Sequence, residues 1–314
     1  MKAMILAAGR GTRLEPLSNL RPKPLFPVVN RPLLGVIIKQ LEGMGVREIV
    51  INTHHLAEKV VDFVRGRRWG LTVEVRVEPE ILGTGGGVKN CADFLGDMPF
   101  FLLVNADIYH TFDLKPVVQY HREENNLATL VLCDDPRLNQ VGVNGEGRIV
   151  SIREKEVQKS HASARILTFT GIHIISSEIF GYTPSEGYFD IIGLYIDLAS
   201  RGKAIKGYQA KEGYWRDIGR VEDYRTLHRD LLGEEANPVI HPTAQIGEGV
   251  RMEGVVCVGR GSHIGAGCLI KDSILWEEVS VKEGSVVEGC VVADGTQVGG
   301  KRRGEVLTPE GKGD

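Results

Sequence analysis

The sequence predicts two structural parts, an α/β domain with a mostly parallel sheet and a short parallel β-helix. Two observations support this prediction. Short apolar runs alternate with amphipathic stretches over about the first 235 residues, and beyond Pro238 apolar residues recur every six positions. The chain has 314 residues, which suits one large domain or two of ordinary size.

Five apolar runs are the expected strands of the α/β domain: Ala3–Ala8, Glu48–Asn52, Thr72–Val77, Phe100–Asn105 and Ala128–Cys133. The amphipathic stretches are the expected helices: Leu33–Met44, Ala57–Arg65, Val88–Phe94, Leu114–Asn125 and a closing helix at Val221–Leu232. Strands that alternate with helices and are too apolar to face water indicate a mostly parallel sheet covered on both sides. Residues 233–238 have the composition of a linker.

The six-residue period predicts the β-helix. Its apolar members are Ile240, Ile246, Met252, Val258, Ile264, Ile270 and Trp276, after which the step slips by one to Val281 and Val287. This period fits neither a helix nor a two-sided strand, and it is typical of triangular coils with one apolar residue at each inner corner. We expect an α/β domain over residues 1–235, a β-helix over 238–300 and, because 301–314 is polar, a disordered tail.

Composition excludes several classes of protein. No stretch approaches the ~18 apolar residues of a membrane helix, and the apolar run at the N-terminus ends at Gly9, short of the ~7–15 residues of a signal core. A net charge of −3 argues against a nucleic-acid binder, and the five cysteines contain no Cys-x-x-Cys pair. We expect a cytoplasmic protein with reduced thiols and neither membrane nor nucleic acid as partner.

The first strand ends in a glycine loop with a strong local positive charge. Gly9 and Gly11 leave backbone N–H groups free to face an anion, and Arg13 and Lys23 follow closely. The spacing fits neither a Walker A loop nor a dinucleotide fingerprint. A plain turn would account for the glycines but not for Arg13 and Pro22-Lys23-Pro24, so the pattern favours polyphosphate binding.

The segment from Leu6 to Leu34, "LAAGRGTRLEPLSNLRPKPLFPVVNRPLL", resembles the N-terminal signature of the sugar-1-phosphate nucleotidyltransferases. The resemblance implies a Rossmann-like, mixed but mostly parallel sheet, followed by a left-handed β-helix of hexapeptide repeats. It also implies transfer of a nucleotidyl group from a nucleoside triphosphate to a sugar 1-phosphate, with Mg²⁺ as cofactor and pyrophosphate as second product.

By this resemblance, Arg13, Lys23, Asp107 and Asp217 carry catalysis, and Asp107 and Asp217 hold the metal. Asp107 follows the strand "FFLLVN", and Asp217 lies in "WRDIG". The nucleotide-binding residues are Leu6, Ala7, Ala8, Gly9, Gly11, Thr12, Arg13, Glu78, Gly83 and Thr84. The sugar-phosphate-binding residues are Gly142, Glu154, Lys155, Thr170 and Gly171.

Two departures from the family pattern are visible. Ala106 stands where glycine is common before the metal-binding Asp, and Glu156 stands where proline usually follows Glu-Lys. The glycines of "LGTGGGVKN" are expected in a loop that lets a base or sugar approach the backbone. Asp190, before a helical pattern, is expected to cap that helix.

The substrates are left open between two pairs. Glu78 stands where uridylyl-using relatives often carry glutamine, and a carboxylate accepts well from guanine, which favours GTP with mannose 1-phosphate. The alternative is UTP with N-acetylmuramate 1-phosphate or another hexose 1-phosphate. A non-catalytic regulatory relative is a third possibility, although the loop arginine, the lysine and both aspartates are present.

The β-helix has two interpretations. It could be an acyltransferase domain, with His241 or His263 as catalytic residue, but the repeats are few and we expect these histidines to be solvated. We favour an assembly module that makes the protein a homo-oligomer.

Overall fold

The computed structural model describes residues 1–314 except 154, 158–163, 186, 234–236, 310 and 314. The chain forms two compact units. The first comprises Met1–Gly9 and Ile37–Asp217, and the second comprises Arg10–Val36 and Ile218–Asp314. The glycine-loop segment after Gly9 thus groups with the β-helix, although the sequence placed it in the α/β domain.

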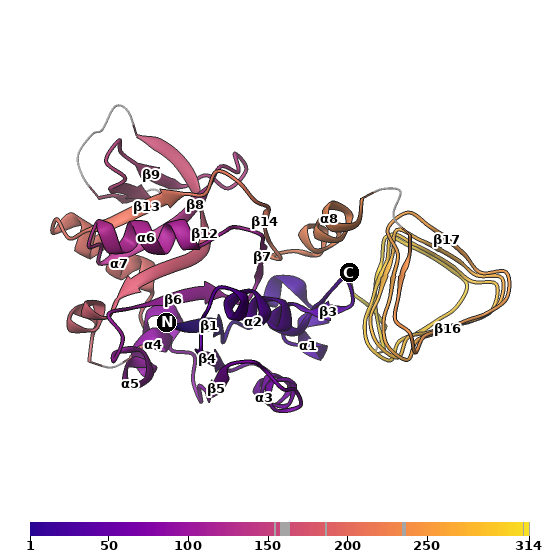
Figure 1. Ribbon diagram of the computed structural model, residues 1–314. Coiled ribbons are helices and arrows are strands. Elements are labelled where there is room, and N and C mark those ends of the chain that lie inside the picture. Colours follow the sequence, from indigo (N-terminus) through magenta and orange to yellow (C-terminus); the bar gives the residue numbers. More distant parts are fainter. Residues whose placement is uncertain (154, 158–163, 186, 234–236, 310, 314) are drawn as a thin grey trace. The chain divides into compact units, whose positions relative to one another are not determined.

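A ten-stranded mixed sheet forms the centre of the first unit (Figure 1). Its main path runs β11-β10-β9-β12-β6-β1-β4-β5, and β8 pairs with β12 and β13. The strands are β1 (Lys2–Ala7), β4 (Glu48–Thr53), β5 (Thr72–Val77), β6 (Phe100–Asn105), β8 (Ala128–Cys133), β9 (Val141–Val143), β10 (Ile149–Ile152), β11 (Lys155–Glu156), β12 (Arg165–Ser176) and β13 (Ile205–Gln209). Strands β1, β4, β5 and β6 are parallel, while β12 runs antiparallel to its neighbours. The predicted mixed sheet is confirmed.

Helices pack on this sheet, and their apolar faces complete its core. They are α2 (Leu33–Gly43), α3 (Ala57–Arg65), α4 (Gly83–Asn90), α5 (Ala92–Leu95), α6 (Lys115–Glu123) and α7 (Ile191–Ser200), with the 3₁₀ turn η3 (Ser177–Tyr182). Met4, Leu103, Leu130 and Tyr195 are fully buried in one apolar cluster. The predicted helix Val88–Phe94 is wrong in its bounds, because α4 begins at Gly83 and a break separates it from α5.

The β-helix forms the C-terminal part of the second unit (Figure 1). Its strands stack in three sheets, β15-β18-β21-β24-β27-β28, β16-β19-β22-β25 and β17-β20-β23-β26. Neighbouring strands run parallel except β28, which pairs antiparallel with β27, and the parallel stacking is consistent with the predicted left-handed form. In the first two sheets the strands are β15 (Val239–Ile240), β18 (Cys257–Val258), β21 (Ile274–Leu275), β24 (Val291–Val292), β27 (Val306–Thr308), β28 (Gly311–Gly313), β16 (Gln245–Ile246), β19 (His263–Ile264), β22 (Ser280–Val281) and β25 (Gln297–Val298). The third has β17 (Arg251–Glu253), β20 (Leu269–Lys271), β23 (Val286–Glu288) and β26 (Lys301–Arg303).

Coil length explains where the six-residue period slips. Ile240 pairs with Val258 eighteen residues on, and Val258 pairs with Leu275 only seventeen residues on. Leu275 therefore occupies the inner position that the hexad pattern gave to Trp276. Trp276 is nevertheless fully buried, because its ring packs on Phe26 and Tyr224 of the same unit.

The predicted disordered tail is wrong. Strands β26, β27 and β28 lie within residues 301–313, and β27 continues the first sheet with Leu307 stacked on Val292. Leu307 is 6% exposed and closes the apolar interior. The six-residue pattern did not predict this strand, because the last coil has only fifteen residues from Val292 to Leu307 and is shorter than the coils before it.

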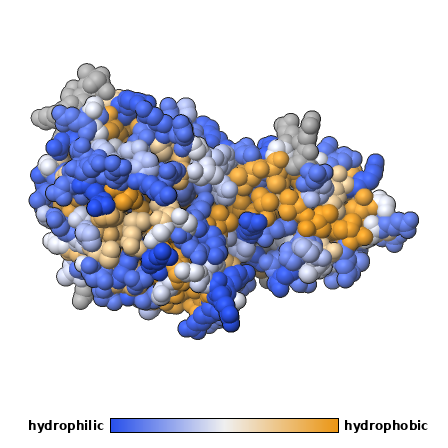
Figure 2. All heavy atoms as spheres, in the orientation of Figure 1, coloured by the Kyte–Doolittle hydropathy of each residue, from blue (hydrophilic) through white to orange (hydrophobic). Residues whose placement is uncertain are grey.

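The first coil leaves apolar surface exposed. Strands β15, β16 and β17 are the first of their sheets, and Ile240 and Ile246 are 40% and 38% exposed. Figure 2 shows hydrophobic surface over the β-helix. An exposed apolar end with open strand edges is a surface that favours association.

The remaining elements of the second unit precede the β-helix. They are η1 (Thr12–Leu14), α1 (Leu17–Leu20), η2 (Lys23–Leu25), the hairpin of β2 (Pro27–Val28) and β3 (Arg31–Pro32), and α8 (Val221–Leu232). The first unit also contains a two-stranded ribbon of β7 (Ile108–His110) and β14 (Trp215–Asp217). Among the residues described, no helix has the length and apolar character needed to cross a membrane.

A buried histidine ties the hairpin to α8. The imidazole of His228 contacts the Tyr224 carbonyl through Nδ1 at 2.9 Å, and Nε2 accepts a hydrogen bond from the Val29 N–H at 3.1 Å. Burial lowers the pKa of His228 from 6.5 to about 4. Because Nε2 must stay unprotonated to accept this bond, the contact requires the neutral ring.

The first prediction concerns this histidine. Since its pKa is lower in the folded chain than in the unfolded one, His228 contributes its full stability above about pH 6.5, and the contribution is lost as the pH falls towards 4. We expect the melting temperature of wild type to exceed that of His228→Asn at pH 8, and the gap to narrow steadily below pH 6.5. Melting curves from pH 4.5 to 8 measure the gap. The exposed His263 gives the control His263→Asn, and a gap for His228→Asn that does not change with pH would contradict the prediction.

Candidate active site

The carboxyl ends of three strands meet at one edge of the sheet. In β1, Leu6 is in register with Asn52 of β4 and with Asn105 of β6. The Ala106 N–H donates to the Leu6 carbonyl at 3.0 Å, which holds the chain after β6 beside the end of β1. Leu6 is half-buried and Ala7 and Ala8 are buried, while Gly9 is exposed. Ligands of open α/β sheets bind at this edge, so the glycine loop starts in the position expected for binding.

The ribbon of β7 and β14 brings two aspartates together. Asp217 pairs with Ile108 across this ribbon, and Asp107 is the residue directly before Ile108. Asp217 is therefore on a strand of the ribbon and Asp107 is in the turn between β6 and β7, so the two residues are near neighbours although they are far apart in the sequence. That their carboxylates form one site stays a prediction.

The two carboxylates suit one kind of metal site. Within the described residues no group of three or more His, Cys, Asp or Glu side chains could hold a metal. Mg²⁺ is commonly bound by one or two carboxylates while substrate phosphates and waters complete its coordination. The donor set of Asp107 and Asp217 thus fits Mg²⁺ bound together with a phosphate substrate.

A buried polar chain connects the end of β1 to the start of α4. The Asn52 side chain accepts from the Ala7 N–H at 3.0 Å and donates to Glu78 Oε1 at 2.7 Å. The other oxygen of Glu78 accepts from the Leu82 N–H at 3.2 Å, and Glu78 is 1% exposed. Asn52 was not among the residues predicted from the sequence, although an asparagine in the apolar run "IVINT" was a signal. Contact between Glu78 and a base stays a prediction, since the residue's visible role is to hold these two segments.

The glycine run lies in helix α4 rather than in a loop, so this expectation is wrong. Gly83 has φ +76°, and a Cβ there would lie 2.6 Å from the Phe189 carbonyl oxygen. At Gly85 a Cβ would lie 2.2 Å from the Phe189 ring, and at Gly87 it would lie 2.7 Å from the Asn52 amide. The glycines therefore let the helix pack closely against protein, and binding of nucleotide by Gly83 and Thr84 stays a prediction.

Thr84 caps the neighbouring helix α7. Its hydroxyl accepts from the Ile191 N–H at 2.9 Å and donates to Asp190 at 2.7 Å. Asp190 occupies the cap position as predicted, but its side chain makes no capping hydrogen bond. The hydroxyl of Thr84 supplies that bond instead, which links α4 to α7.

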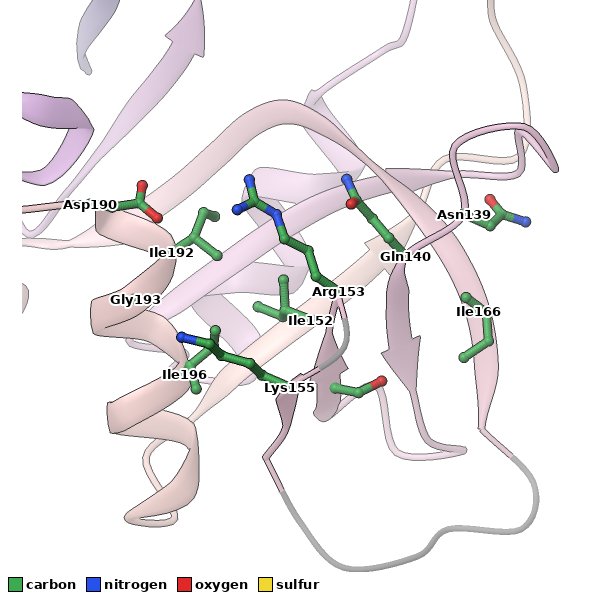
Figure 3. Close-up of a pocket in the computed structure, with 11 residues that line it drawn as sticks. Asn139, Gln140, Ile152, Arg153, Lys155, Ile166, Asp190, Ile192, Gly193 and Ile196 are labelled. Atoms are coloured by element: carbon green, nitrogen blue, oxygen red, sulfur yellow. The ribbon is translucent and has the colours of Figure 1, made fainter.

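A pocket of about 700 Å³ opens beside the start of α7 (Figure 3). Lys155 lines it, together with Arg153, Ser151 and Asp190. The side chains of Arg153 and Lys155 extend towards α7, and a helix N-terminus also favours an anion. Arg153 was not among the residues predicted from the sequence. Glu154, predicted to bind the sugar phosphate, lies outside the described residues.

Gly142 packs tightly against one residue of this pocket, because a Cβ there would lie 2.3 Å from the Ser151 hydroxyl. Thr170 and Gly171 occupy an irregular part of β12. The Thr170 hydroxyl is buried and donates to the Val131 carbonyl at 2.8 Å. The backbone carbonyl of Thr170 accepts a hydrogen bond from Trp215 Nε1 at 2.9 Å. Gly171 has φ +79°, and a Cβ there would lie 2.7 Å from the Asn105 amide. Their binding of sugar phosphate stays a prediction.

The two cations of the glycine-loop segment belong to the second unit. Gly11 has φ +68°, and a Cβ there would lie 3.5 Å from the Cβ of Lys23. Thr12 and Arg13 are exposed in η1, whereas Lys23 is 7% exposed in η2. The left-handed turn at Gly11 thus brings the loop back against the Pro-Lys-Pro segment.

Comparison with known proteins identifies the family of the chain. Residues 2–234 match the family model described as nucleotidyl transferase, and residues 235–308 match the GMPPB C-terminal domain. The chain belongs to the nucleotidyl transferase family. The resemblance in the N-terminal signature is thereby confirmed, and the protein is a nucleotidyltransferase.

Several members of the family are similar over most of the chain. A UTP–glucose-1-phosphate uridylyltransferase of Synechocystis is 30% identical, covering 95% of this chain and 84% of the relative. A mannose-1-phosphate guanylyltransferase of Mycobacterium tuberculosis is 28% identical, covering 91% and 82%. The crystal structure of HddC from Yersinia pseudotuberculosis complexed with GMP-PN matches with a TM-score of 0.62 at 26% identity, covering 73% of this chain and 99% of that one.

The second prediction tests the tight turn at Gly171. We expect Gly171→Ala to destabilise the protein by at least about 1 kcal/mol, because alanine is strained at positive φ and its Cβ would displace Asn105. A loss of this size lowers the melting temperature by about 2–4 °C. Gly145→Ala is the control, since Gly145 has ordinary φ and open space around it. Equal melting temperatures for the two variants would show that Gly171 is not constrained in this way.

Proposed function

We propose that this nucleotidyltransferase transfers a nucleotidyl group from a nucleoside triphosphate to a sugar 1-phosphate in a Mg²⁺-dependent reaction, giving a nucleoside-diphosphate sugar and pyrophosphate. The observation that supports the proposal is the pairing of Asp217 with Ile108, the residue that follows Asp107. Asp107 and Asp217 would hold Mg²⁺, which when bound offsets the negative charge of the phosphates.

The protein side chains have a limited task in this reaction. A phosphate monoester is already anionic at neutral pH, since its second pKa is about 6, so its oxygen can attack the α-phosphorus without a general base. The new P–O bond forms as the bond to the leaving pyrophosphate breaks. Arg13 and Lys23 would stabilise the negative charge on the triphosphate, and alignment of the two polyanions supplies the rest of the acceleration.

The sugar phosphate would occupy the pocket beside α7. Lys155 and Arg153 both line it, and the two cations can neutralise a phosphate at the helix N-terminus. Gly142, which the sequence predicts to bind the sugar phosphate, packs against Ser151 of the same pocket. Because the predicted Glu154 is adjacent in sequence, the pocket also agrees with the family's Glu-Lys pattern.

We propose GTP and mannose 1-phosphate as the substrates. Relatives named mannose-1-phosphate guanylyltransferase and the GMP-PN complex of HddC support this choice. The Synechocystis relative named for UTP and glucose 1-phosphate supports the alternative of a uridylyltransferase. The burial of Glu78 weakens the argument that this carboxylate reads guanine, so the relatives carry the preference for GTP.

The third prediction tests reaction and substrates together. With Mg²⁺, we expect wild type to release pyrophosphate fastest from GTP and mannose 1-phosphate in a grid that crosses GTP, UTP, dTTP, CTP and ATP with mannose, glucose, heptose and N-acetylmuramate 1-phosphates. Asp107→Asn and Asp217→Asn should each lower kcat by on the order of 10²-fold or more, because a charge that stabilises the transition state is lost.

Asp62→Asn, on the exposed face of α3, is the matched control and should keep wild-type activity. Release only with UTP would overturn the choice of base and keep the mechanism. Folded wild type that is silent across the grid would favour a regulatory, non-catalytic relative, and near-normal activity of Asp107→Asn would remove the metal assignment.

We further propose that the open end of the β-helix joins two copies of the chain in a cytoplasmic homo-oligomer. The exposed Ile240 and Ile246 and the three edge strands of the first coil support this proposal. A second copy would cover the same apolar surface and satisfy its open strand edges.

The fourth prediction is that Ile246→Glu shifts the protein to monomer in sedimentation velocity, because a charge at the centre of an apolar contact is costly to bury. Glu248→Lys, at an exposed turn of the same coil, is the control and should leave the oligomer intact. A wild type that sediments as a monomer at all concentrations would end the proposal.

A further inference from the structure

An arginine close to Lys23 is bound by the β-helix. Arg21 Nε donates to Asp294 Oδ2 at 2.8 Å, and Nη2 donates to Oδ1 of the same carboxylate at 2.9 Å. Glu277 adds a longer contact to Nη1 at 3.4 Å. The Arg21 side chain is 14% exposed, so this bidentate pair is largely removed from water. Such forked pairs fix orientation as well as position.

The acceptor is itself held in place. Asp294 Oδ1 also accepts from the Glu277 N–H at 3.0 Å, which fixes the carboxylate to the neighbouring coil. Glu277 in turn accepts from Arg260 at 2.6 Å. Arg21 therefore binds a preorganised acidic pair and not a mobile side chain.

An aromatic cluster holds the chain on the other side of Lys23. The rings of Phe26 and Trp276 meet edge to face at 4.7 Å, and Trp276 Nε1 donates to the Tyr224 hydroxyl at 3.1 Å. That hydroxyl donates to the Pro27 carbonyl. Trp276, directly after strand β21, thus links the β-helix to the segment after Lys23. This packing explains why Trp276 is buried although it does not face the apolar interior of the coils.

The hairpin that follows is fastened as well. The Asn30 side-chain amide donates to the carbonyls of Val239 and Val258, at 3.0 and 2.9 Å, on successive strands of one β-helix sheet. Asn30 has φ +60°, a conformation that asparagine tolerates better than most residues. One side chain therefore bridges the hairpin to two coils.

Lys23 lies between these attachments. Its turn η2 is closed by the Leu25 N–H on the Pro22 carbonyl at 2.8 Å, and Arg21 Nη1 lies 3.5 Å from the Leu25 carbonyl. The Cβ of Lys23 in turn borders Gly11 of the glycine loop. All the contacts described here, from Arg21 to Asn30, lie within one compact unit.

We propose that the β-helix positions the catalytic lysine, with Arg21 and Asp294 as the principal positioning residues. The inference rests on the proposed function, in which Lys23 contacts the triphosphate. It gives the β-helix a part in the reaction besides assembly. A displacement of about 1 Å at a charge-stabilising group can cost about 10²-fold in rate, so an anchor of this kind affects turnover without touching substrate.

The fifth prediction uses a double-mutant cycle on kcat/KM for the triphosphate, measured by pyrophosphate release. We expect Arg21→Ala to lower kcat/KM by about 10- to 100-fold. In the Lys23→Ala background the same change should cost less than about 2-fold, because the group that Arg21 positions is already gone. Arg21→Lys should recover little, since lysine cannot form the forked pair.

Arg303→Ala is the matched control. It removes another arginine–carboxylate pair of the β-helix, with Glu288 at 3.0 Å, which joins strands β26 and β23. We expect its kcat/KM to equal that of wild type. Melting temperatures of all variants separate folding from positioning.

The outcomes distinguish the inference from the function on which it rests. If Lys23→Ala is impaired while Arg21→Ala has wild-type kcat/KM, the positioning role is wrong and the proposed function stands. If Arg21→Ala lowers kcat/KM equally in the presence and absence of Lys23, the Arg21–Asp294 pair only stabilises the fold. This result would also overturn the inference. If wild type is inactive, or Lys23→Ala is fully active, the proposed function fails and the inference fails with it.

Discussion

Strand β1 is hydrogen-bonded on both sides, and the geometry of the site depends on that constraint. Its pairing with β4 and β6 leaves the strand no freedom of register, because a shift of one residue would turn its buried side chains to the opposite face of the sheet. The chain must therefore leave the sheet at Ala8 and Gly9. The ends of β4 and β6 bring Asn52 and Asn105 to the same edge. Asp107 lies in the turn between β6 and the ribbon, so its position follows from the same pairing.

The glycine-loop segment, which follows β1, is also held by contacts with the β-helix. Residues 10–36 belong to the compact unit of the β-helix, where Arg21, Phe26 and Asn30 make their contacts. A loop that binds a polyanion must hold several positive charges close together, which is unfavourable when no ligand is bound. Acidic residues such as Asp294 and Glu277 offset part of this repulsion by binding Arg21.

The sequence predicted the elements whose signal is local. Strands Thr72–Val77, Phe100–Asn105 and Ala128–Cys133 and helix Ala57–Arg65 have the bounds expected from apolar runs and periodicity. The disordered tail was wrong because one short coil broke the six-residue spacing while Leu307 kept its apolar environment. The glycine run was misplaced because glycine in a helix that packs closely on Phe189 has the same composition as a loop.

The site was only partly visible in the sequence, for a similar reason. Asp107 and the glycine loop follow an apolar strand, and their position at the sheet edge is a property of that strand. Asn52 stood out only as a polar residue in an apolar run and Asp294 gave no signal, because each acts through a partner that is distant in sequence. Trp276 was assigned to the interior of the coil because hexads report burial but not the surface against which a residue is buried.

The three tryptophans have different surroundings, and this gives the protein its own optical reporters. Trp69 donates to the Val64 carbonyl beside Phe63, away from the site residues. Trp215 bonds to Thr170 two residues before Asp217, and Trp276 packs on Phe26 next to Arg21. Replacement of any two by phenylalanine leaves a single tryptophan, whose emission can be excited apart from that of the eight tyrosines. The emission of Trp215 would then follow events at the aspartate pair, and that of Trp276 would follow the attachment of the loop, without a dye or a label.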